Sequence, residues 1–219
     1  MSIKSKYILY KDLIKTKGFS RIKSESQDIK AYTKYYKIKP NDVVIDIGAY
    51  HGWFTLLNYN YNSRFYAFDI DPVNYKILNK NLFNKFKNIS FFNKGVWNQT
   101  GVSKLYGDRV GSMGSHINFK NKRKSKDVEC QVITLEDIVK ENNIKKIDFI
   151  KIDVEGAEIE IIESSLDLLK KYKPNLSIAT YHVRNNQKTY LKIEELLKKV
   201  GYAKVFTENK KHLTTYAIK

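Results

Sequence analysis

Short runs of β-forming residues alternate with helical patterns along most of this chain, and this alternation limits the possible folds more than any other feature. Two runs, VVIDI at 43–47 and IDFIKI at 147–152, are almost continuous in β-formers, as central strands of a parallel sheet are. We expect strands at Val43–Ile47, Arg64–Phe68, Ile89–Phe92, Val128–Thr134, Ile147–Ile152, Leu176–His182, Val205–Thr207 and Leu213–Ile218. The pattern predicts an α/β fold with a mostly parallel sheet, helices on both faces and a final antiparallel pair.

The connecting segments predict helices and a simple domain organisation. Helical patterns occupy 26–37, 52–59, 72–84, Leu135–Asn142, 156–171 and 187–200. The 219 residues contain three prolines, no internal repeat and no low-complexity linker, and this length suits one domain of ordinary size. We therefore predict an N-terminal helical appendage at 1–39 and a single catalytic or binding domain at 40–219.

Several classes of protein are disfavoured by what the sequence lacks. No apolar run approaches the roughly eighteen residues that a membrane-spanning helix needs. Lysines interrupt the short apolar stretch near the N-terminus, unlike the apolar region of a signal peptide. The single cysteine, Cys130, excludes an internal disulfide framework and a cysteine-based zinc cluster. We expect a cytoplasmic protein without a membrane span, and the sequence does not indicate its oligomeric state.

The formal net charge of +17 permits two interpretations. Only 5 of the 40 basic residues are arginine, so lysine enrichment of the whole surface accounts for the charge without a binding site. A basic protein can also be attracted to phosphates, and the stretch KNKRKSK at 120–126 is the densest basic patch. Because RNA-binding surfaces usually recruit arginine, nucleic acid is a possible but not a favoured partner.

A glycine-containing loop follows the first expected strand. It reads Asp46-Ile47-Gly48-Ala49-Tyr50-His51-Gly52, with the spacing D-x-G-x-x-x-G in place of the dinucleotide G-x-G-x-x-G. Glycines here allow a tight turn and a close approach of the backbone to a ligand. A carboxylate beside the loop repels a pyrophosphate but suits the ammonium and sulfonium groups of S-adenosylmethionine. We assign Asp46, Gly48, Ala49, Tyr50 and Gly52 to the binding of this cofactor.

The second expected strand ends at Asp69, 23 residues after Asp46. A carboxylate at this distance is placed to accept hydrogen bonds from both ribose hydroxyls of an adenosine cofactor. Asp71, directly before Pro72, better suits the N-cap of the following helix. Asp69 is therefore the expected ribose ligand.

The segment IDFIKIDVEGAE at 147–158 strongly resembles the signature of the FkbM family of methyltransferases. VIDIGAYHGWFT at 44–55, YAFDIDP at 66–72 and VITLEDI at 132–138 are similar to other motifs of that family, so the likeness extends over roughly 40–182. The resemblance implies a Rossmann-like class I methyltransferase with a seven-stranded sheet and an antiparallel last strand. It also implies S-adenosyl-L-methionine as cofactor and methyl transfer, usually to a hydroxyl of a sugar or small metabolite.

The chain departs from the family pattern at three places. Asp69 stands where the family more often has glutamate, which should preserve the ribose contact. The loop histidine of the family is often one residue earlier, at Tyr50, so His51 is given no role. Residues 179–182 read ATYH, where relatives commonly carry a glutamate shortly before the histidine. The acceptor side of the site is therefore not defined by the resemblance.

Three residues are candidates for the chemistry. Asp153 follows the strand at 147–152, beside the expected methyl position, and is assigned to cofactor binding and to orienting or deprotonating the acceptor. Glu155 is either a catalytic group or a favourable negative charge at a helix N-terminus. His182 is either a base that titrates near neutrality or a hydrogen-bonded residue at the sheet edge. These three side chains are of types that bind divalent metals, but nothing in the sequence fixes their distances, and no metal is assigned.

Three functions remain open at this stage. The leading one is S-adenosylmethionine-dependent O-methylation of a small-molecule or glycan acceptor. The second is methylation of an RNA ribose 2'-hydroxyl; exocyclic adenine methylation is disfavoured because Asp153-Val154-Glu155-Gly156 stands where an Asp/Asn-Pro-Pro-Tyr/Phe motif is expected. The third is a binding protein that keeps the fold without catalysis, against which the intact set of site residues argues.

Overall fold

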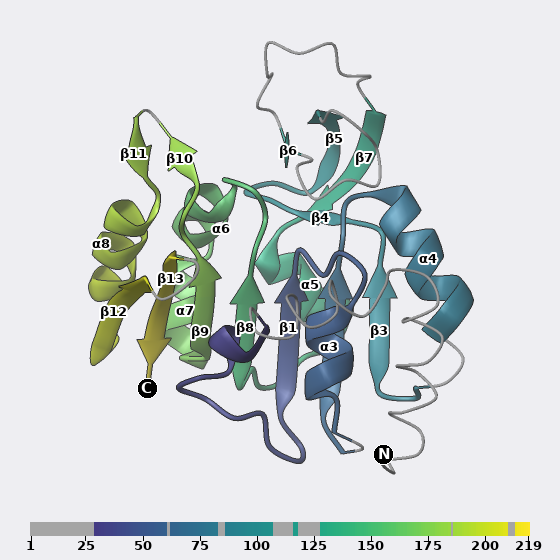
Figure 1. Cartoon of the computed structure of the whole chain (residues 1–219), viewed down its shortest axis with the longest axis horizontal. Helices are drawn as coiled ribbons and strands as arrows, with labels where there is room; N and C mark the ends of the chain where they lie inside the picture. Colours follow the sequence, from purple (N-terminus) through teal and green to yellow (C-terminus); the bar gives the residue numbers. More distant parts are fainter. Residues whose placement is uncertain are drawn as a thin grey trace.

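A seven-stranded sheet forms the centre of the computed structural model (Figure 1). The structure describes residues 29–60, 62–82, 86–106, 116–117, 128–184, 186–209 and 213–219. The sheet has the order β12-β13-β9-β8-β1-β2-β3. Its strands are β1 (Val43–Ile47), β2 (Arg64–Phe68), β3 (Ile89–Phe92), β8 (Phe149–Ile152), β9 (Asn175–Ala179), β12 (Lys204–Asn209) and β13 (Leu213–Ile218).

The strand order confirms the predicted Rossmann-like class I methyltransferase topology. The last strand, β13, runs antiparallel to both of its neighbours, β9 and β12, while β3, β2, β1, β8 and β9 are mutually parallel. β1 pairs with β2 on one side and with β8 on the other. From β1 the chain continues to β2 and β3 on one side, whereas the later strands β8 and β9 lie on the other side. The carboxyl ends of β1 and β8 therefore form the switch point where open α/β sheets bind ligands.

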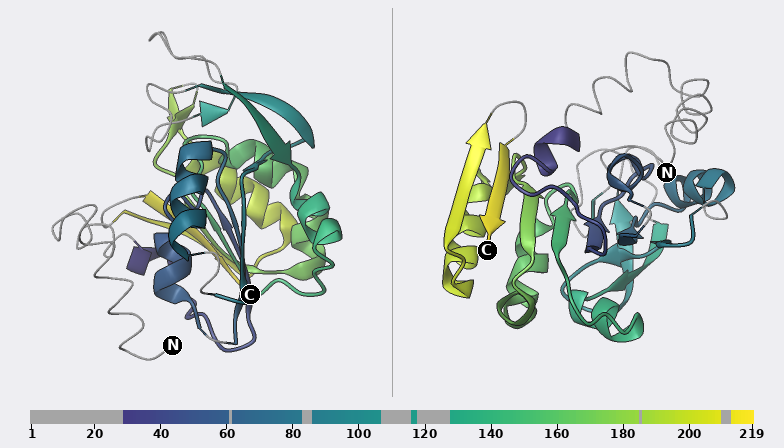
Figure 2. Two further views of the ribbon diagram at one scale, coloured as in Figure 1. Left: turned by 90° about the vertical axis from the view of Figure 1, so that its right-hand side faces the viewer. Right: turned by 90° about the horizontal axis from the view of Figure 1, so that it is seen from below.

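Side chains alternate between the two faces of the sheet, as the period of a β-strand requires. Val44 and Phe65 join one buried cluster, which includes residues of α3 (Trp53–Asn58). Their neighbours Ile45 and Tyr66 join the other cluster. That second cluster contains residues of α5 (Leu135–Glu141), α6 (Glu158–Ser164), α7 (Leu166–Tyr172) and α8 (Tyr190–Val200). Helices cover both faces, as the left view of Figure 2 shows.

A smaller four-stranded sheet lies beyond the carboxyl ends of the central strands (Figure 1). Its order is β4-β7-β5-β6, with β4 (Gly95–Val96), β7 (Val128–Ile133), β5 (Gly101–Tyr106) and β6 (His116–Ile117). The strand expected at 128–134 is thus confirmed, and it belongs to this second sheet because it pairs antiparallel with β5. The short hairpin β10 (Val183–Arg184) and β11 (Gln187–Lys188) extends from the same end.

Three helix predictions are wrong in extent. The helix expected at 187–200 begins only at Tyr190, because Gln187 and Lys188 pair with β10 as strand β11. Within the expected helix at 26–37, the described residues form a helical turn only at 29–32. The chain then has no regular structure at 36–39, and Tyr36 stacks on Phe149 of the sheet at 5.7 Å between ring centroids. The single helix expected at 156–171 is two helices, α6 and α7, which meet at the fully buried Ser165.

Some predictions lie on residues outside those described. These are residues 1–28 of the predicted N-terminal appendage and the basic stretch at 120–126. The expected helix at 72–84 is described as α4 (Pro72–Leu82). Within the described part of the chain, no helix combines the length and the apolar character needed to cross a bilayer.

Candidate active site

The loop after β1 lies between the ends of β2 and β8. Gly48 has a φ of +77°, and a Cβ built on it is 1.8 Å from the carbonyl oxygen of Asp153. The amides of Gly48 and Ala49 both donate to the carbonyl oxygen of Phe68, at 3.0 and 2.8 Å. Only glycine fits at position 48, because the loop there touches the backbone that follows β8.

Asp46, at the end of β1, is fully buried beneath this loop. Its Oδ2 accepts a hydrogen bond from Thr55 at 2.7 Å, and its Oδ1 lies 3.2 Å from Nζ of Lys151. The same ammonium group donates to the carbonyl oxygen of Gly48 at 2.6 Å. Asp46 is not among the described residues that line the pocket, so its carboxylate contacts the loop and not the pocket surface.

The other predicted loop residues divide into two groups. Gly48 and Tyr50 line the pocket. Ala49 is buried in the core, and Gly52, with a φ of 74°, precedes the first residue of α3. Tyr50 also has a positive φ of 50°, an uncommon conformation that directs its amide to Asp69 Oδ2 at 2.6 Å. His51, to which no role is given, is buried and stacks on Tyr50 at 3.6 Å.

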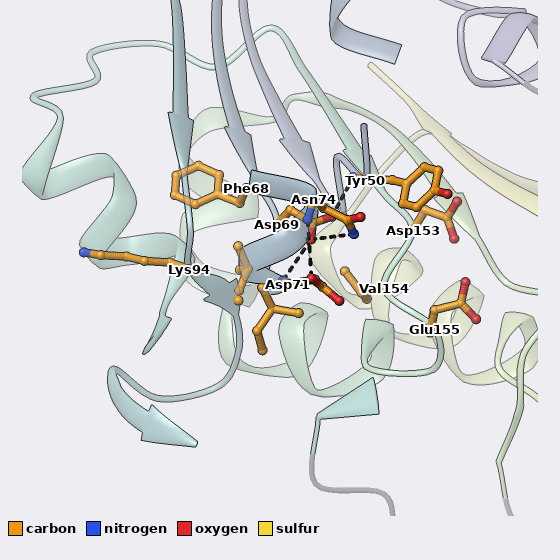
Figure 3. Close-up of a pocket in the computed structure, with 13 residues that line it drawn as sticks. Tyr50, Phe68, Asp69, Asp71, Asn74, Lys94, Asp153, Val154 and Glu155 are labelled. Atoms are coloured by element: carbon orange, nitrogen blue, oxygen red, sulfur yellow. Dashed lines mark hydrogen bonds between the residues drawn. The ribbon is translucent and has the colours of Figure 1, made fainter. Parts of the chain in front are cut away.

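Asp69 follows β2 and lines the pocket, as expected for a ribose ligand (Figure 3). Besides the Tyr50 amide, it accepts hydrogen bonds from the amide of Asp71 at 2.9 Å and from Asn74 Nδ2 at 3.2 Å. Burial raises the pKa of Asp69 to about 7, although the three donors favour the ionised form. Asp71 Oδ1 accepts from the amide of Val73 at 2.8 Å, which confirms its predicted role as the cap of α4.

The pocket joins the end of β2 to the end of β8. An apolar part is formed by Phe68, Ile70 and Val96, beside Gly95. Trp97 is buried in the core and contributes no surface to the pocket lining. The lining residues are Gly48, Tyr50, Phe68, Asp69, Ile70, Asp71, Asn74, Lys94, Gly95, Val96, Asp153, Val154 and Glu155 (Figure 3).

Asp153 directly follows β8, and its amide donates to the carbonyl oxygen of Ile47 at 3.0 Å. Its carboxylate Oδ2 accepts a hydrogen bond from the hydroxyl of Tyr32 at 2.9 Å. Burial, followed by the charge of Asp153, raises the pKa values of Tyr32 and Tyr181 well above the usual range for tyrosine. Both phenols therefore stay protonated around this carboxylate, which faces the pocket beside Gly48.

Glu155 and His182 meet Asp153 at the open edge of the pocket. One ligand-type atom from each of the three side chains lies within 4.8 Å of the other two. His182 Nε2 is 3.4 Å from Glu155 Oε2, and Nδ1 is 2.9 Å from Oε1 of the fully buried Glu158. Glu155 has a φ of 57°, so the backbone is held in a sparsely populated conformation at this point. The three predicted catalytic residues are therefore brought together.

The charge state of His182 differs from the expectation. Burial favours the neutral imidazole, but the facing carboxylates of Glu155 and Glu158 outweigh it and raise the pKa of His182 to about 10. The prediction of a histidine that titrates near neutrality is wrong for this environment. The facing carboxylates therefore favour the imidazolium over a neutral ring that could accept a proton from an acceptor hydroxyl.

Residues 46–204 match the family model of the methyltransferase FkbM domain. The match covers well over half of the chain and includes every predicted site residue. The chain belongs to the FkbM methyltransferase family. Among curated proteins, none matches the sequence.

Solved structures of methyltransferases share the fold of this FkbM domain. The methyltransferase FkbM of Methylobacillus flagellatus has a TM-score of 0.59 at 16% identity, over 84% of this chain and 45% of that one. Precorrin-6y C5,15-methyltransferase from Geobacter metallireducens gives 0.51 at 14%, over 87% of both chains. Fibrillarin from Aeropyrum pernix, solved with natively bound S-adenosyl-L-methionine, gives 0.50 at 11%, over 83% of this chain and 68% of that one. The chain thus spans less than half of the length of the Methylobacillus protein.

Three residues of this FkbM domain site were not identified from the sequence. Tyr32 lies 121 residues from its partner Asp153, and no local pattern connects them. Glu158 accepts a hydrogen bond from the amide of Gly156 at 3.1 Å and lies 2.9 Å from Nδ1 of His182. Lys151 could have been identified from the sequence, because a lysine within the buried run IDFIKI requires a partner for its charge.

Proposed function

We propose that this protein transfers the methyl group of S-adenosyl-L-methionine to a hydroxyl of a sugar or another small metabolite. One observation carries the proposal. A single pocket joins Asp69, at the end of β2, to Asp153, at the end of β8, across the glycine loop at the switch point of the sheet. Ligands of open α/β sheets bind at this switch point, where an adenosine cofactor would have its ribose at one carboxylate and its reactive group near the other.

The cofactor assignment is supported by the chemistry of the lining. The Asp69 carboxylate is a suitable acceptor for two ribose hydroxyls, and Phe68, Ile70 and Val96 offer apolar contacts for an adenine ring. The absence of a side chain at Gly48 lets the ligand approach the backbone. The fibrillarin structure contains the same cofactor on a similar fold, which is consistent with this assignment.

The proposed reaction is an in-line displacement at the sulfonium methyl group. The acceptor oxygen forms a bond to the methyl carbon while the carbon–sulfur bond breaks, which gives a methyl ether and S-adenosylhomocysteine. The proton of the acceptor hydroxyl passes to a carboxylate of the pocket, Asp153 or Glu155, and from there to solvent. Asp153 is placed to orient this hydroxyl, since its carboxylate lines the pocket and Tyr32 holds its Oδ2 at 2.9 Å. Alignment of this kind supplies a large part of the rate in bimolecular transfers.

Cofactor binding is tested by thermal unfolding of the full chain with and without S-adenosylmethionine. We expect the cofactor to raise the melting temperature of the native protein, as any ligand of the folded state does. Asp69→Ala should lose most of this rise, measured against the melting temperature of the variant itself. Asp153→Asn should keep the rise and lose turnover. An unchanged melting temperature of the native protein with saturating cofactor contradicts the proposal.

The acceptor is tested by transfer of a tritiated methyl group into fractionated cell extract. Label in small glycans or metabolites supports the proposal. Label in RNA supports the alternative of ribose 2'-hydroxyl methylation, whose salt dependence then reports the number of phosphate contacts. Cofactor binding without label in any fraction supports the second alternative, a binding protein that keeps the fold without catalysis.

A further inference from the structure

The strongest unassigned feature is the group of Asp153, Glu155 and His182 at the open edge of the pocket. Each contributes one oxygen or nitrogen atom to a set whose members lie within 4.8 Å of one another. Two of these residues, Asp153 and Glu155, line the pocket itself. Ligands of one octahedral magnesium or manganese ion are separated by about 3 Å when adjacent and by about 4 Å when opposite. Side-chain movements of about one ångström therefore suffice to place the three on one ion.

His182 is oriented as metal-binding histidines are. Its side chain is 9% exposed, and Nδ1 faces the fully buried Glu158 at 2.9 Å. Nε2 lies 3.4 Å from Oε2 of Glu155, and neither ring nitrogen makes a hydrogen bond with the described residues, although both face carboxylates. A carboxylate on one imidazole nitrogen fixes the ring and leaves the other nitrogen for the ion, which is a recurrent arrangement around protein-bound metals.

Glu158 is itself held in place by its surroundings. Its Oε1 accepts hydrogen bonds from the amides of Val154 at 3.4 Å and of Gly156 at 3.1 Å. The same turn carries Glu155 in its left-handed conformation, with a φ of 57°. One buried carboxylate thus positions both the imidazole and the backbone that presents Glu155. The contacts of Glu158 with His182 and with the turn do not depend on a cation.

We propose that Asp153, Glu155 and His182 bind one divalent cation, Mg²⁺ or Mn²⁺, which in turn binds the acceptor hydroxyl. The two carboxylates are of the ligand type that suits these ions, and three protein ligands leave positions open for an acceptor and water. Because a cation binds Nε2 only in its deprotonated form, cation binding releases the Nε2 proton of the imidazolium to solvent. This inference adds a cation to the proposed function. The role of the cation in catalysis rests on the proposed methyl transfer.

The cation changes how the hydroxyl becomes a nucleophile. A bound divalent ion lowers the pKa of a coordinated hydroxyl, so the hydroxyl loses its proton more readily. That proton passes to solvent by way of Glu155, whose side chain is 25% exposed. The metal-bound alkoxide then forms the oxygen–carbon bond as the carbon–sulfur bond breaks. The products are the methyl ether and S-adenosylhomocysteine, and the ion stays on its three ligands.

The test is a titration of the full chain with Mn²⁺, followed by electron paramagnetic resonance, which separates free from bound ion. We expect one Mn²⁺ per chain, displaced by excess Mg²⁺. Glu155→Gln and His182→Asn should each weaken Mn²⁺ binding by about tenfold or more. Glu163→Gln, an exposed charge removal on α6, is the matched control and should leave Mn²⁺ affinity unchanged. The inference is overturned if Mn²⁺ does not bind at millimolar free concentration, or if both variants bind it as the native protein does.

Two further measurements separate this inference from the proposed function. The S-adenosylmethionine-induced rise in melting temperature should persist in Glu155→Gln and His182→Asn, which also shows that both variants fold. A rise in melting temperature without specific Mn²⁺ binding overturns the metal site alone. Specific Mn²⁺ binding without any rise overturns the proposed cofactor and leaves the metal site established. In the transfer assay, chelation should reduce labelling at least tenfold and added Mn²⁺ should restore it.

Discussion

The ammonium group of Lys151 lies 3.2 Å from Oδ1 of Asp46, between two adjacent central strands of the sheet. Both side chains are almost completely buried, at 5% and 0% exposure. Lys151 also donates to the carbonyl oxygen of Gly48 at 2.6 Å, so this ion pair is linked directly to the backbone of the glycine loop. The carboxylate before the loop thus has a partner that the loop motif itself does not contain.

Replacement of Lys151 by methionine should destabilise the protein strongly. The change keeps most of the side-chain volume but leaves the Asp46 carboxylate buried with only the Thr55 hydroxyl as partner. Loss of one member of a buried ion pair typically costs about 3–5 kcal/mol. We expect a fall of this size in the free energy of unfolding, measured with urea.

The double variant Asp46→Asn with Lys151→Met is the control for this prediction. It removes both charges, so no uncompensated carboxylate stays in the core. It should be more stable than Lys151→Met alone, because the larger part of the cost comes from the unpaired charge. Equal stability of Lys151→Met and the native protein contradicts the importance of the pair.

Gly48→Ala should lose both stability and cofactor binding. Its Cβ lies 1.8 Å from the Asp153 carbonyl oxygen, so the loop and the end of β8 must separate. Gly201→Ala is a matched control, since Gly201 also has a positive φ of +82° but its Cβ meets only the flexible end of Lys173, at 3.4 Å. The control should cost about 1–2 kcal/mol for the left-handed backbone, and Gly48→Ala about 1–3 kcal/mol more for the clash. Similar losses in urea unfolding for both variants contradict the close contact.

Asp69 should make the stability of the ligand-free protein depend on pH. Its pKa is about 7 in the folded state, above the value of about 3.9 of an unfolded chain. The folded state therefore binds the proton more tightly, and this group lowers stability progressively as pH rises from about 4 to about 7. Melting temperatures at pH 5 and pH 8 should show a larger loss at high pH in the native protein than in Asp69→Asn. An identical pH profile of the two proteins contradicts the raised pKa.

Cofactor binding should release a proton at Asp69. Ribose hydroxyls donate to the ionised carboxylate, so S-adenosylmethionine favours the deprotonated form of a group whose pKa is about 7 in its absence. At pH 6 we expect proton release on binding, and weaker binding than at pH 8. Calorimetric titrations in two buffers with different ionisation enthalpies measure this release. The prediction fails if the binding enthalpy at pH 6 is the same in both buffers.

The parts of the fold that local sequence determines could be predicted. Val44 and Ile45 point to opposite faces of β1 because side chains alternate along any strand, and both faces are covered as the continuous apolar run requires. The spacing of Gly48 from Asp46 located the loop, and the family resemblance located Asp153. Each of these inferences depends on residues within a few positions of one another.

The properties of the site that depend on distant residues could not be predicted. The charge state of His182 follows from Glu155 and Glu158, which precede it by more than twenty residues and reach it only through the fold. The helix expected over 156–171 is interrupted at Ser165, whose surroundings are fully buried. Local patterns carry no information on such contacts, because burial and facing charges arise only when the elements pack.

Tyr32→Phe should lower kcat, and it should also cause a limited loss in the free energy of unfolding. The Tyr32 hydroxyl donates to Asp153 Oδ2 at 2.9 Å, and its removal leaves a carboxylate in the pocket without that constraint. We expect a stability loss of about 1.5–3 kcal/mol from one hydrogen bond to a charged group. The variant should show a lower kcat with little change in cofactor affinity, since Asp69 and the glycine loop are untouched.

Tyr36→Phe supplies the matched control, because the Tyr36 hydroxyl donates to Asp42 Oδ2, also at 2.9 Å, away from the pocket lining. Both substitutions remove one oxygen from a tyrosine–aspartate hydrogen bond, so their losses of stability should be similar. Only Tyr32→Phe should change kcat, because only its partner carboxylate faces the proposed acceptor. Equal turnover of the two variants in the methyl-transfer assay would show that the Tyr32 contact stabilises the fold without positioning Asp153 for the reaction.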